Sequence, residues 1–455
     1  MSSYFFLHPV QWAQAQWGHA ELGDIRRTRR AVKLGAAIAA QSAASLPKQT
    51  QDWGDLKAAY RLLNEEAVTH TQLSLPHWQT TRWQATMHPG TPVLFVQDMS
   101  ELDFSAHRRL EGAGHLSHLG YGFLLHSCLA LLPDAVNPTL LGLAHQTVWK
   151  RDIRRRRTET KIQRQKRRNE ADIWAETVEA IGPVPAGACW VSVGDRASDI
   201  FSYVRRARAL GWHGLVRVNQ DRRITAHDGK PGRLKPYVRA LAAQATKTVV
   251  MRGKDGMPAR QVVFQVAWTS LTLAPPATRA ERHERPQPGW CMRVWNDTEE
   301  MEWMLFSTLP LDEGHGALEQ IGWYEHRWLI EEYHKCLKTG CAIEKRRLTT
   351  AGGLLALLGF LALTAVRILQ LRSLARANPQ QSAGTAHIEP LCLQLMAARL
   401  NTKPGALSVA QFWRGVATLG GFIGRTGDGE PGWQTLWEGW RRLQDMCWGA
   451  LWMET

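Results

Sequence analysis

The sequence predicts a mixed α/β protein, in which a β-sheet has helices on its faces and helical segments come before and after it. Three observations lead to this prediction. Residues 8–85 mix apolar and polar side chains with few strand-like runs. Short apolar runs that lead to an aspartate then alternate with helical segments, an order typical of a sheet covered by helices. Residues 350–455 are again helical in pattern and rich in tryptophan. We therefore expect three domains, over residues 1–85, 86–349 and 350–455.

The first domain contains a strongly basic helix. Asp24 is a suitable N-cap for it, and the side chains that follow include Arg26, Arg27 and Arg30. The residues alone leave two interpretations open, contact with DNA phosphates or a solvated basic face. The helical pattern of this domain is broken at 45–47.

The charge of the whole chain favours a polyanionic partner. Lys and Arg number 56 against 41 Asp and Glu, which gives a net charge of +15, and the pI is near 9.8. Such a surplus is typical of nucleic-acid-binding proteins, although a basic protein without such a partner would have the same charge.

The cysteines and the longest apolar run narrow the class of protein further. The seven cysteines are scattered and form no CxxC pair, which argues against a disulfide framework and a zinc site and fits a reducing compartment. The N-terminal residues do not have the pattern of a signal peptide. The uncharged run 349–366 is marginal in length for a membrane span, so we favour a buried helix and expect no membrane partner.

Two apolar runs in the middle domain each lead to an aspartate. Residues 93–96 precede Asp98, and residues 189–193 precede Asp195. Each run is typical of a strand buried in a sheet. We interpret Asp199 as the cap of a following helix. Further strands are expected at 119–132, 139–149 and 212–218, and helices at 170–181 and 199–210.

The rest of the middle domain departs from this alternation. Residues 150–168 are dense in Lys and Arg, so we expect a solvated loop or the start of a helix there. Residues 221–300 contain short alternating runs such as 261–268, which predict a β-rich insertion. A strand at 303–307 then returns the chain to the core, and a long helix begins near Gly316.

The two aspartates suggest a metal site. If their strands are neighbours, both carboxylates emerge at the same edge of the sheet. Two like charges held close together are unfavourable unless a cation lies between them, and oxygen ligands suit Mg²⁺ or Mn²⁺. Two such ions about 3.5–4 Å apart can hold the attacking and leaving oxygens of a displacement at phosphorus. A turn or a helix cap is the ordinary alternative for either aspartate.

The helix over 324–338 is more informative. At 100° per residue, one of its faces carries a phenol, a guanidinium, a carboxylate and two ammonium groups, from Tyr324, Arg327, Glu331, Lys335 and Lys338. A salt-bridged surface helix would have this pattern. A metal ligand flanked by phosphate-binding side chains would have it too, and we favour that interpretation. Because Glu332 adjoins Glu331, the spacing and not the residue type selects Glu331.

This helix resembles the Y-(2)-R-(3)-E-(6)-K signature of bacterial insertion-sequence transposases, in the insertion-sequence-four family. The matching residues are Tyr324, Arg327, Glu331 and Lys338. The string HRWLIEEYHKCLKTG is most similar to the cut-and-paste members that pass through a DNA hairpin. Other segments that resemble this family are 22–28, 59–62, 97–98, 194–200, 216–217, 303–307, 419–422 and 432–440.

The resemblance implies a DDE transposase with an RNase H-like (retroviral-integrase-like) catalytic core. Asp98, Asp195 and Glu331 would hold two Mg²⁺ ions per active site, for which Mn²⁺ would substitute. The β-rich insertion would interrupt this core, the N-terminal domain would bind the transposon ends, and the C-terminal region would mediate dimerisation.

The resemblance also implies contacts with DNA. Trp303 would stack on a flipped base and Arg217 would approach the transposon end. Tyr324, Arg327 and Lys338 would hold phosphates around the hairpin, with Lys335 on the same helix face. The expected partners are terminal inverted repeats, target DNA and a second copy of the chain, in the bacterial cytoplasm with the nucleoid.

Two other functions remain open at this point. A catalytically inactive or domesticated derivative would bind DNA without cutting it. An RNase H-like nuclease would cut DNA without joining it to a target. For the tryptophans at 433, 437 and 440, core packing or a subunit interface is favoured over base stacking, because their spacing is helical.

Overall fold

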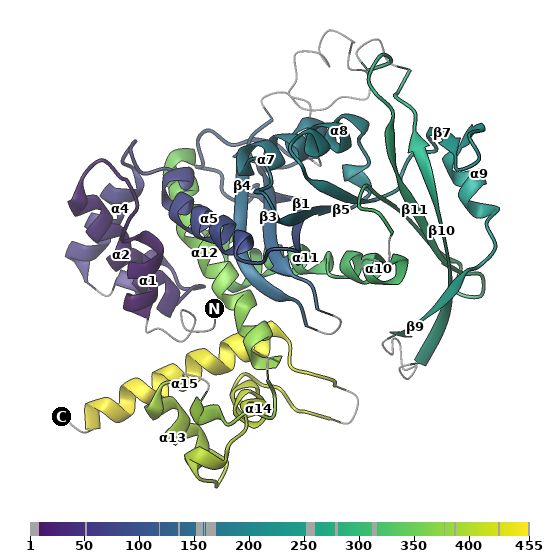
Figure 1. The fold of residues 1–455 in the computed structure, drawn as a ribbon. Helices are drawn as coiled ribbons and strands as arrows, with labels where there is room; N and C mark the ends of the chain where they lie inside the picture. The colour runs from purple at the N-terminus through teal and green to yellow at the C-terminus, as the bar shows by residue number, and fades with distance from the viewer. Residues whose placement is uncertain are drawn as a thin grey trace.

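The computed structural model has three parts: a group of N-terminal helices, a large twisted sheet with helices on its faces, and a group of C-terminal helices (Figure 1). The described residues are 9–50, 52–117, 119–134, 137–151, 158, 160, 170–251, 260–277, 281–311, 316–376, 378–385, 388–425 and 428–453.

The N-terminal part is helical, as the sequence predicts. Asp24 caps α2, and its side chain accepts a hydrogen bond from the backbone N–H of Arg26, which confirms the predicted cap. The last helix of this part, α5, lies against β4 of the sheet. The helices are α1 (Pro9–Trp17), α2 (Ile25–Ala40), α3 (Leu46–Thr50), α4 (Trp53–Leu63) and α5 (His70–Thr86).

Twelve strands form one mixed sheet in the described part of the chain. Its order is β2-β3-β1-β5-β6-β12-β11-β10-β7-β8, with β4 paired to β3 and β9 paired to β10. The strands are β1 (Pro92–Asp103), β2 (Gly114–His115), β3 (Tyr121–Leu132), β4 (Thr139–Trp149), β5 (Cys189–Gly194), β6 (His213–Arg217), β7 (Arg223–Ala226), β8 (Pro231–Arg233), β9 (Ala245–Met251), β10 (Arg260–Leu273), β11 (Gln287–Asn296) and β12 (Met301–Ser307).

Helices cover both faces of the central strands. In β1, Val93 and Phe95 pack into the core beneath α7 (Ile173–Ile181) and α8 (Phe201–Ala209). Leu94 and Val96 pack on the opposite face, into the core shared with α11 and α12. Because successive side chains of a strand point to opposite faces, a strand buried on both sides has the unbroken apolar run seen in the sequence.

Residues 221–300, which the sequence predicts as a β-rich insertion, contain strands that extend the same sheet. β7 to β11 lie within these residues, together with one short helix, α9 (Leu234–Arg239). β12 pairs with β11 on one side and with β6 on the other. The insertion is therefore continuous with the central strands (Figure 1).

The long helix expected from Gly316 is divided. α10 covers Ala317–Glu325, α11 covers Trp328–Lys335, and a π-helical turn covers Cys336–Gly340. The prediction of one regular helix was wrong, since periodicity of side chains does not register a local change of backbone pitch.

Most of the predicted basic segment 150–168 lies outside the described residues. Of its described residues, Lys150, Thr158 and Thr160 are exposed as expected, whereas Arg151 is buried. The guanidinium of Arg151 binds both carboxylate oxygens of Glu170, at 2.5 and 2.8 Å, and also contacts Glu101 at 3.0 Å. Two acids thus compensate the buried charge.

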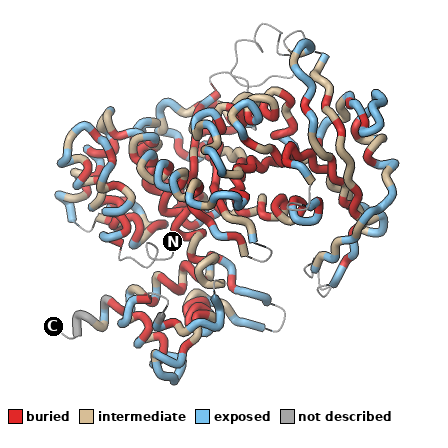
Figure 2. The backbone as a smooth tube through the Cα atoms, in the orientation of Figure 1, coloured by how far each residue is buried: buried red, intermediate tan, exposed pale blue. Residues whose placement is uncertain are grey.

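The C-terminal helices surround the end of a long apolar helix, α12. By length and composition α12 could cross a membrane, but 89% of its most apolar window is buried inside the protein, as Figure 2 shows for this part of the chain. This confirms the buried helix that the sequence favours. The tryptophans at 433, 437 and 440 are buried, which supports core packing. The helices are α12 (Ala351–Arg376), α13 (Pro390–Arg399), α14 (Val409–Leu419) and α15 (Trp433–Met453).

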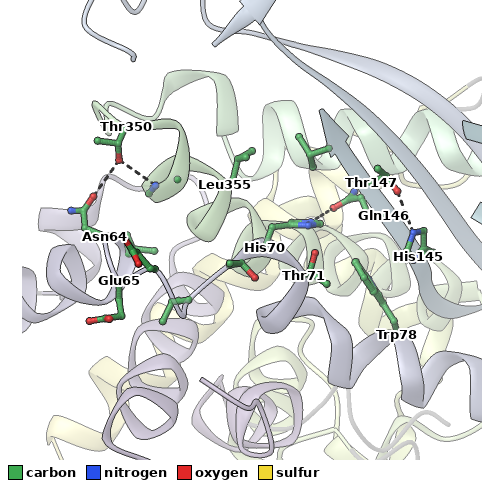
Figure 3. Close-up of a pocket in the computed structure, with 17 residues that line it drawn as sticks. Asn64, Glu65, His70, Thr71, Trp78, His145, Gln146, Thr147, Thr350 and Leu355 are labelled. Atoms are coloured by element: carbon green, nitrogen blue, oxygen red, sulfur yellow. Dashed lines mark hydrogen bonds between the residues drawn. The ribbon is translucent and has the colours of Figure 1, made fainter. Parts of the chain in front are cut away.

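A buried polar network crosses the core between α5 and α11. The Nε2 atom of His70 donates to the Gln146 side-chain oxygen at 2.8 Å (Figure 3). The Gln146 amide donates to Ser127 Oγ and to Tyr333 OH, both at 2.9 Å. His334 Nε2 lies 3.1 Å from Ser127 Oγ. Buried polar groups need such partners, so the network fixes α5, β3, β4 and α11 relative to one another.

The crossing of α14 and α15 depends on glycine. A Cβ atom on Gly439 would collide with the backbone carbonyl oxygen of Val416. We expect Gly439→Ala to lower the free energy of unfolding by about 1–3 kcal/mol, because neither backbone can move away without repacking. Gly449→Ala, on the same helix with nothing within 4 Å of its added Cβ, should be neutral or stabilising by up to about 1 kcal/mol. Thermal unfolding compares the two variants, and equal melting temperatures would contradict the close-contact argument.

Candidate active site

The two aspartates lie at the same level of neighbouring strands. β1 and β5 pair in parallel from Pro92↔Cys189 to Val96↔Val193. Asp98 and Asp195 each follow two residues beyond that last pair, so the expected neighbourhood of their strands is confirmed. One detail was wrong: Asp98 does not end its strand. β1 continues to Asp103 because β3 still pairs with it, with Asp98 opposite Ser127.

Glu331 approaches Asp98 from α11. Arg327 lies between these two acids: its guanidinium is 2.5 Å from Glu331 Oε1 and 3.6 Å from Asp98 Oδ2. The Asp98 and Arg327 side chains are each 19% exposed, whereas that of Glu331 is 57% exposed. The arginine is therefore the countercharge that holds the two carboxylates near each other.

Asp98 has an altered affinity for protons. Burial raises the pKa of its carboxyl to about 6, and the like charges of Asp195 and Glu331 raise it as well. The backbone N–H of Met99 and the Arg327 guanidinium act in the opposite direction. Because only a close cation or a proton relieves such a cluster, the site should attract cations.

An open cavity of about 420 Å³ gives access to this cluster. Asp98 and Glu331 lie on its wall, next to His334, Lys335 and Lys338. The wall of the cavity therefore carries both carboxylates and ammonium groups. A phosphate group bound there would have cations beside it and metal-ligating oxygens within reach.

The donors fit a divalent cation, but they do not yet form a closed set of ligands. Among the described residues, no group of three or more His, Cys, Asp or Glu side chains is arranged to hold a metal ion. The carboxylates of Asp98 and Glu331, which share a guanidinium, are nevertheless the hard oxygen donors that Mg²⁺ and Mn²⁺ take. Closure around an ion would require Glu331 to exchange Arg327 for the metal.

Two aromatic rings and a guanidinium form a cluster beside the carboxylates, from Tyr324, Trp303 and Arg217. Tyr324 is buried on α10 and meets the Trp303 ring edge-on, with 5.9 Å between ring centroids. The Arg217 guanidinium lies 5.5 Å from the Trp303 ring centroid. Burial raises the pKa of Tyr324, while Arg327 and Arg217 act to lower it. Three residues from β6, β12 and α10 that the sequence singled out are thus brought together.

The break before α11 separates some residues that the sequence placed on one helix face. Tyr324 belongs to α10, Glu331 to α11 and Lys338 to the π-helical turn. Lys338 pairs with Glu344 at 3.5 Å. Burial raises the pKa of the Cys336 thiol, and the charge of Glu332, the residue next to Glu331, raises it further. Of the two adjacent glutamates, Glu331 is the one that borders the Asp98 cavity.

The predicted basic residues of α2 are paired with acids of the same domain. Arg26 pairs with Asp24 at 2.8 Å and Arg27 with Glu65 at 2.7 Å. Arg30 and Lys33 both bind Asp55, at 2.6 and 2.5 Å. DNA contact by these residues stays a prediction. The pairs hold α2 to the neighbouring segments, and a DNA phosphate would have to compete with them.

Asp199 is not the helix cap that the sequence suggested, because Ile200 occupies that position. Its buried carboxylate instead accepts backbone hydrogen bonds from Asn219 and Gln220, both at 2.7 Å, and pairs with Arg222 at 2.9 Å. These partners follow 20 to 23 residues later in the chain. Local sequence carries no signal for such a contact.

Fold and site together define a mixed α/β protein with acidic residues gathered at the edge of its central strands. Residues 9–68, which span α1 to α4, match the family described as transposase DNA-binding. A solved chain from a piggyBac transposase synaptic complex with hairpin DNA is also similar, at 10% identity over 91% of this chain and 77% of that chain. Its TM-score is 0.35, and a likeness so distant carries no weight for fold or function.

The raised pKa of Asp98 has a consequence for stability. Its value of about 6 in the folded protein exceeds the ordinary 3.8. The contribution of Asp98 to the free energy of unfolding is therefore fully present below pH 4 and is lost as the pH rises through 6. We expect Asp98→Asn to be more stable than the wild type at pH 8, by roughly 1–3 kcal/mol, and equally stable near pH 4. Urea unfolding at both pH values measures this.

Added Mg²⁺ provides the control for that measurement. It should raise the melting temperature of the wild type at pH 8 and leave that of Asp98→Asn unchanged. A variant that is less stable than the wild type at pH 8 would contradict the environment described for Asp98.

Proposed function

We propose that this chain is a DNA transposase whose catalytic residues are Asp98, Asp195 and Glu331. The observation that carries the proposal is the placement of Asp98 and Asp195 at the same level of paired strands, with Arg327 joining Asp98 to Glu331. The chain's residues 9–68 also match the transposase DNA-binding family. DNA binding through that N-terminal part brings the substrate, and the carboxylate cluster is the site of the reaction.

We interpret the middle domain as an RNase H-like core. The sheet order β4-β3-β1-β5-β6 supports this, with β1, β3 and β4 antiparallel and β5 and β6 parallel to β1. In this arrangement the first aspartate lies on the central strand and the second follows the adjacent parallel strand.

The proposed reaction is a series of displacements at phosphorus. Water first cleaves one strand at the element end and leaves a 3′-hydroxyl. That hydroxyl attacks the opposite strand and closes a hairpin, which a second water opens. The 3′-hydroxyl then attacks target DNA, so that one phosphodiester bond forms as another breaks. Each step has the same in-line geometry, so one set of side chains can serve all of them.

The residues of the chain have distinct parts in these steps. Asp98, Asp195 and Glu331 would hold two Mg²⁺ ions, which supply activation of the attacking oxygen and stabilisation of the leaving oxygen when bound. Arg327 would leave Glu331 and bind a phosphate oxygen with its planar fork. Lys335 and Lys338, on the wall of the same cavity, would hold neighbouring phosphates.

Removal of a carboxylate tests the catalytic assignment. With DNA that carries the repeats flanking the gene, and Mg²⁺ or Mn²⁺, Asp195→Ala and Glu331→Gln should lose at least about 100-fold in cleavage and in strand transfer. Glu332→Gln is the matched control and should retain activity, because its side chain does not border the cavity. Gel assays separate nicked, hairpin and joined products.

The same assays distinguish the rival functions. A wild type that cuts without joining would be a nuclease, and one that binds the repeats without cutting would be an inactive derivative. Full activity in Asp195→Ala would overturn the assignment of the carboxylates.

Trp303 tests the hairpin step. If its ring receives an extruded base, Trp303→Ala should leave nicking intact and slow hairpin formation about tenfold or more, since stacking is worth about 1–3 kcal/mol per base. Trp295→Ala is a suitable control. Trp295 also lies in a strand of the sheet with an arginine over its ring, since the Arg293 guanidinium is 4.1 Å from the ring centroid. Equal losses of nicking and hairpin formation would count against base capture.

A further inference from the structure

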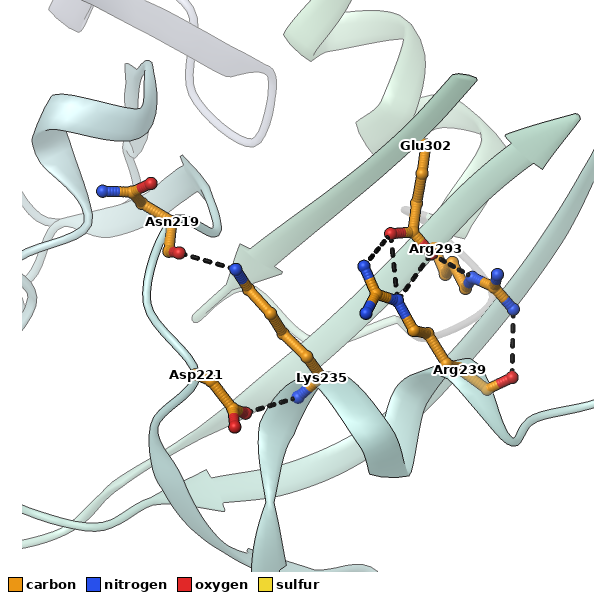
Figure 4. A network of polar contacts seen from close by, with 6 residues as sticks. All are labelled: Asn219, Asp221, Lys235, Arg239, Arg293 and Glu302. Carbon is orange, nitrogen blue, oxygen red and sulfur yellow. Dashed lines mark hydrogen bonds and ion pairs between the residues drawn. The ribbon is translucent and has the colours of Figure 1, made fainter. Parts of the chain in front are cut away.

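A second, smaller cavity lies beside the carboxylate cluster. Its volume is about 250 Å³, and β12, α9 and the segment after β6 form its walls. Four cationic side chains and one carboxylate line it: Arg196, Arg217, Lys235, Arg239 and Glu302. Figure 4 shows Lys235 and Arg239 extending from α9 toward these walls.

The charge of this cavity is strongly positive. Glu302 is shared between two arginines: Arg239 binds it at 2.5 Å and Arg293 at 2.8 Å (Figure 4). These arginines lower the pKa of the Glu302 carboxyl. The Lys235 ammonium donates to the backbone carbonyl of Asn219 at 2.7 Å, and a carbonyl does not neutralise a full charge. A bound anion would therefore meet several donors and one carboxylate that is already compensated.

Hydrogen bonds to a buried carboxylate fix the turn that forms one wall of this cavity. Asn219 belongs to the turn that the buried Asp199 carboxylate binds through two backbone N–H groups and Arg222. Charge-assisted hydrogen bonds to a buried carboxylate are strong, so the carbonyl that positions Lys235 is fixed before any ligand arrives. A site fixed in advance loses little conformational entropy on binding.

Two residues connect this cavity to the candidate active site. Arg196 directly follows Asp195 in the chain. Arg217 lines the cavity and also reaches the Trp303 ring. A DNA strand that passes the carboxylates and Trp303 would therefore carry its neighbouring phosphates over this cavity.

We propose that this cavity binds a backbone phosphate of the DNA strand that enters the active site, with Lys235 and Arg239 as its main ligands. This inference rests on the proposed function. Arg239 exchanges one carboxylate oxygen of Glu302 for a phosphate oxygen, and Lys235 contributes a second donor. Neither residue reads the base sequence, so the contact positions the strand.

Salt dependence of DNA binding tests the proposal. The probe is a short fluorescent duplex of unrelated sequence with free ends, bound in EDTA so that no cleavage occurs. The slope of log Kd against log salt concentration should fall by about one for Lys235→Gln or Arg239→Gln and by about two for the double variant.

Arg260→Gln is the matched control. Arg260 pairs with Glu299 at 2.5 Å and is 55% exposed, closely matching the 2.5 Å pair and 54% exposure of Arg239, but it does not line the cavity. Its slope should equal that of the wild type. Equal slopes in all proteins, or an equal fall in Arg260→Gln, would overturn the proposal.

Cleavage assays keep the two proposals separate. If the slope falls as expected but no protein cleaves DNA, the cavity is a phosphate site and the catalytic proposal fails. If cleavage depends on Asp195 but the slopes do not differ, the catalytic proposal stands and the cavity proposal fails.

Discussion

The parallel pairing of β1 with β5 is the constraint on which the candidate site depends. Its register sets Asp98 and Asp195 at one level, and α11, which packs against β1, brings Glu331 to the Asp98 side of this pair. β1 can run on past Asp98 only because β3 continues to pair with it. β1 thus carries Asp98, and its pairing with β3 holds that residue in a partly buried position.

Charge balance follows from this geometry. Neighbouring carboxylates repel one another, and Arg327 compensates two of them in the structure, the partly buried Asp98 and the more exposed Glu331. The same guanidinium is well suited to phosphate. Under the proposed function, the guanidinium that compensates the acids in the absence of DNA would bind a phosphate once metal ions and DNA are bound, so the site would need no separate source of positive charge.

Much of the fold could be predicted from the sequence, and the reasons differ between elements. The apolar runs before Asp98 and Asp195 and the alternation in β10 are strong local signals, because burial on one or two faces imposes them. The break between α10 and α11 was not predicted, since the residues around His326 keep a helical pattern across it. Arg327 and Glu331 keep the predicted helical spacing because both lie on the C-terminal side of that break.

Contacts between distant segments account for what the sequence could not supply. The partners of Asp199 and the pairing of Arg27 with Glu65 and of Arg30 with Asp55 are set by the tertiary fold. A basic helix and a capping aspartate look the same in sequence whether or not such partners exist. Lys235 and Arg239 were missed for a related reason: their helix lies in a segment with no motif, and only the tertiary fold brings Arg239 to Glu302 of β12.

The amide of Gln146 joins the N-terminal helices to the helix that carries Glu331. His70 and Tyr333 would each lose a buried partner if either part were replaced by one from a distant relative. A chimaera that joins one of these parts to a foreign counterpart is therefore expected to pack correctly only where this trio of side chains is kept as a unit.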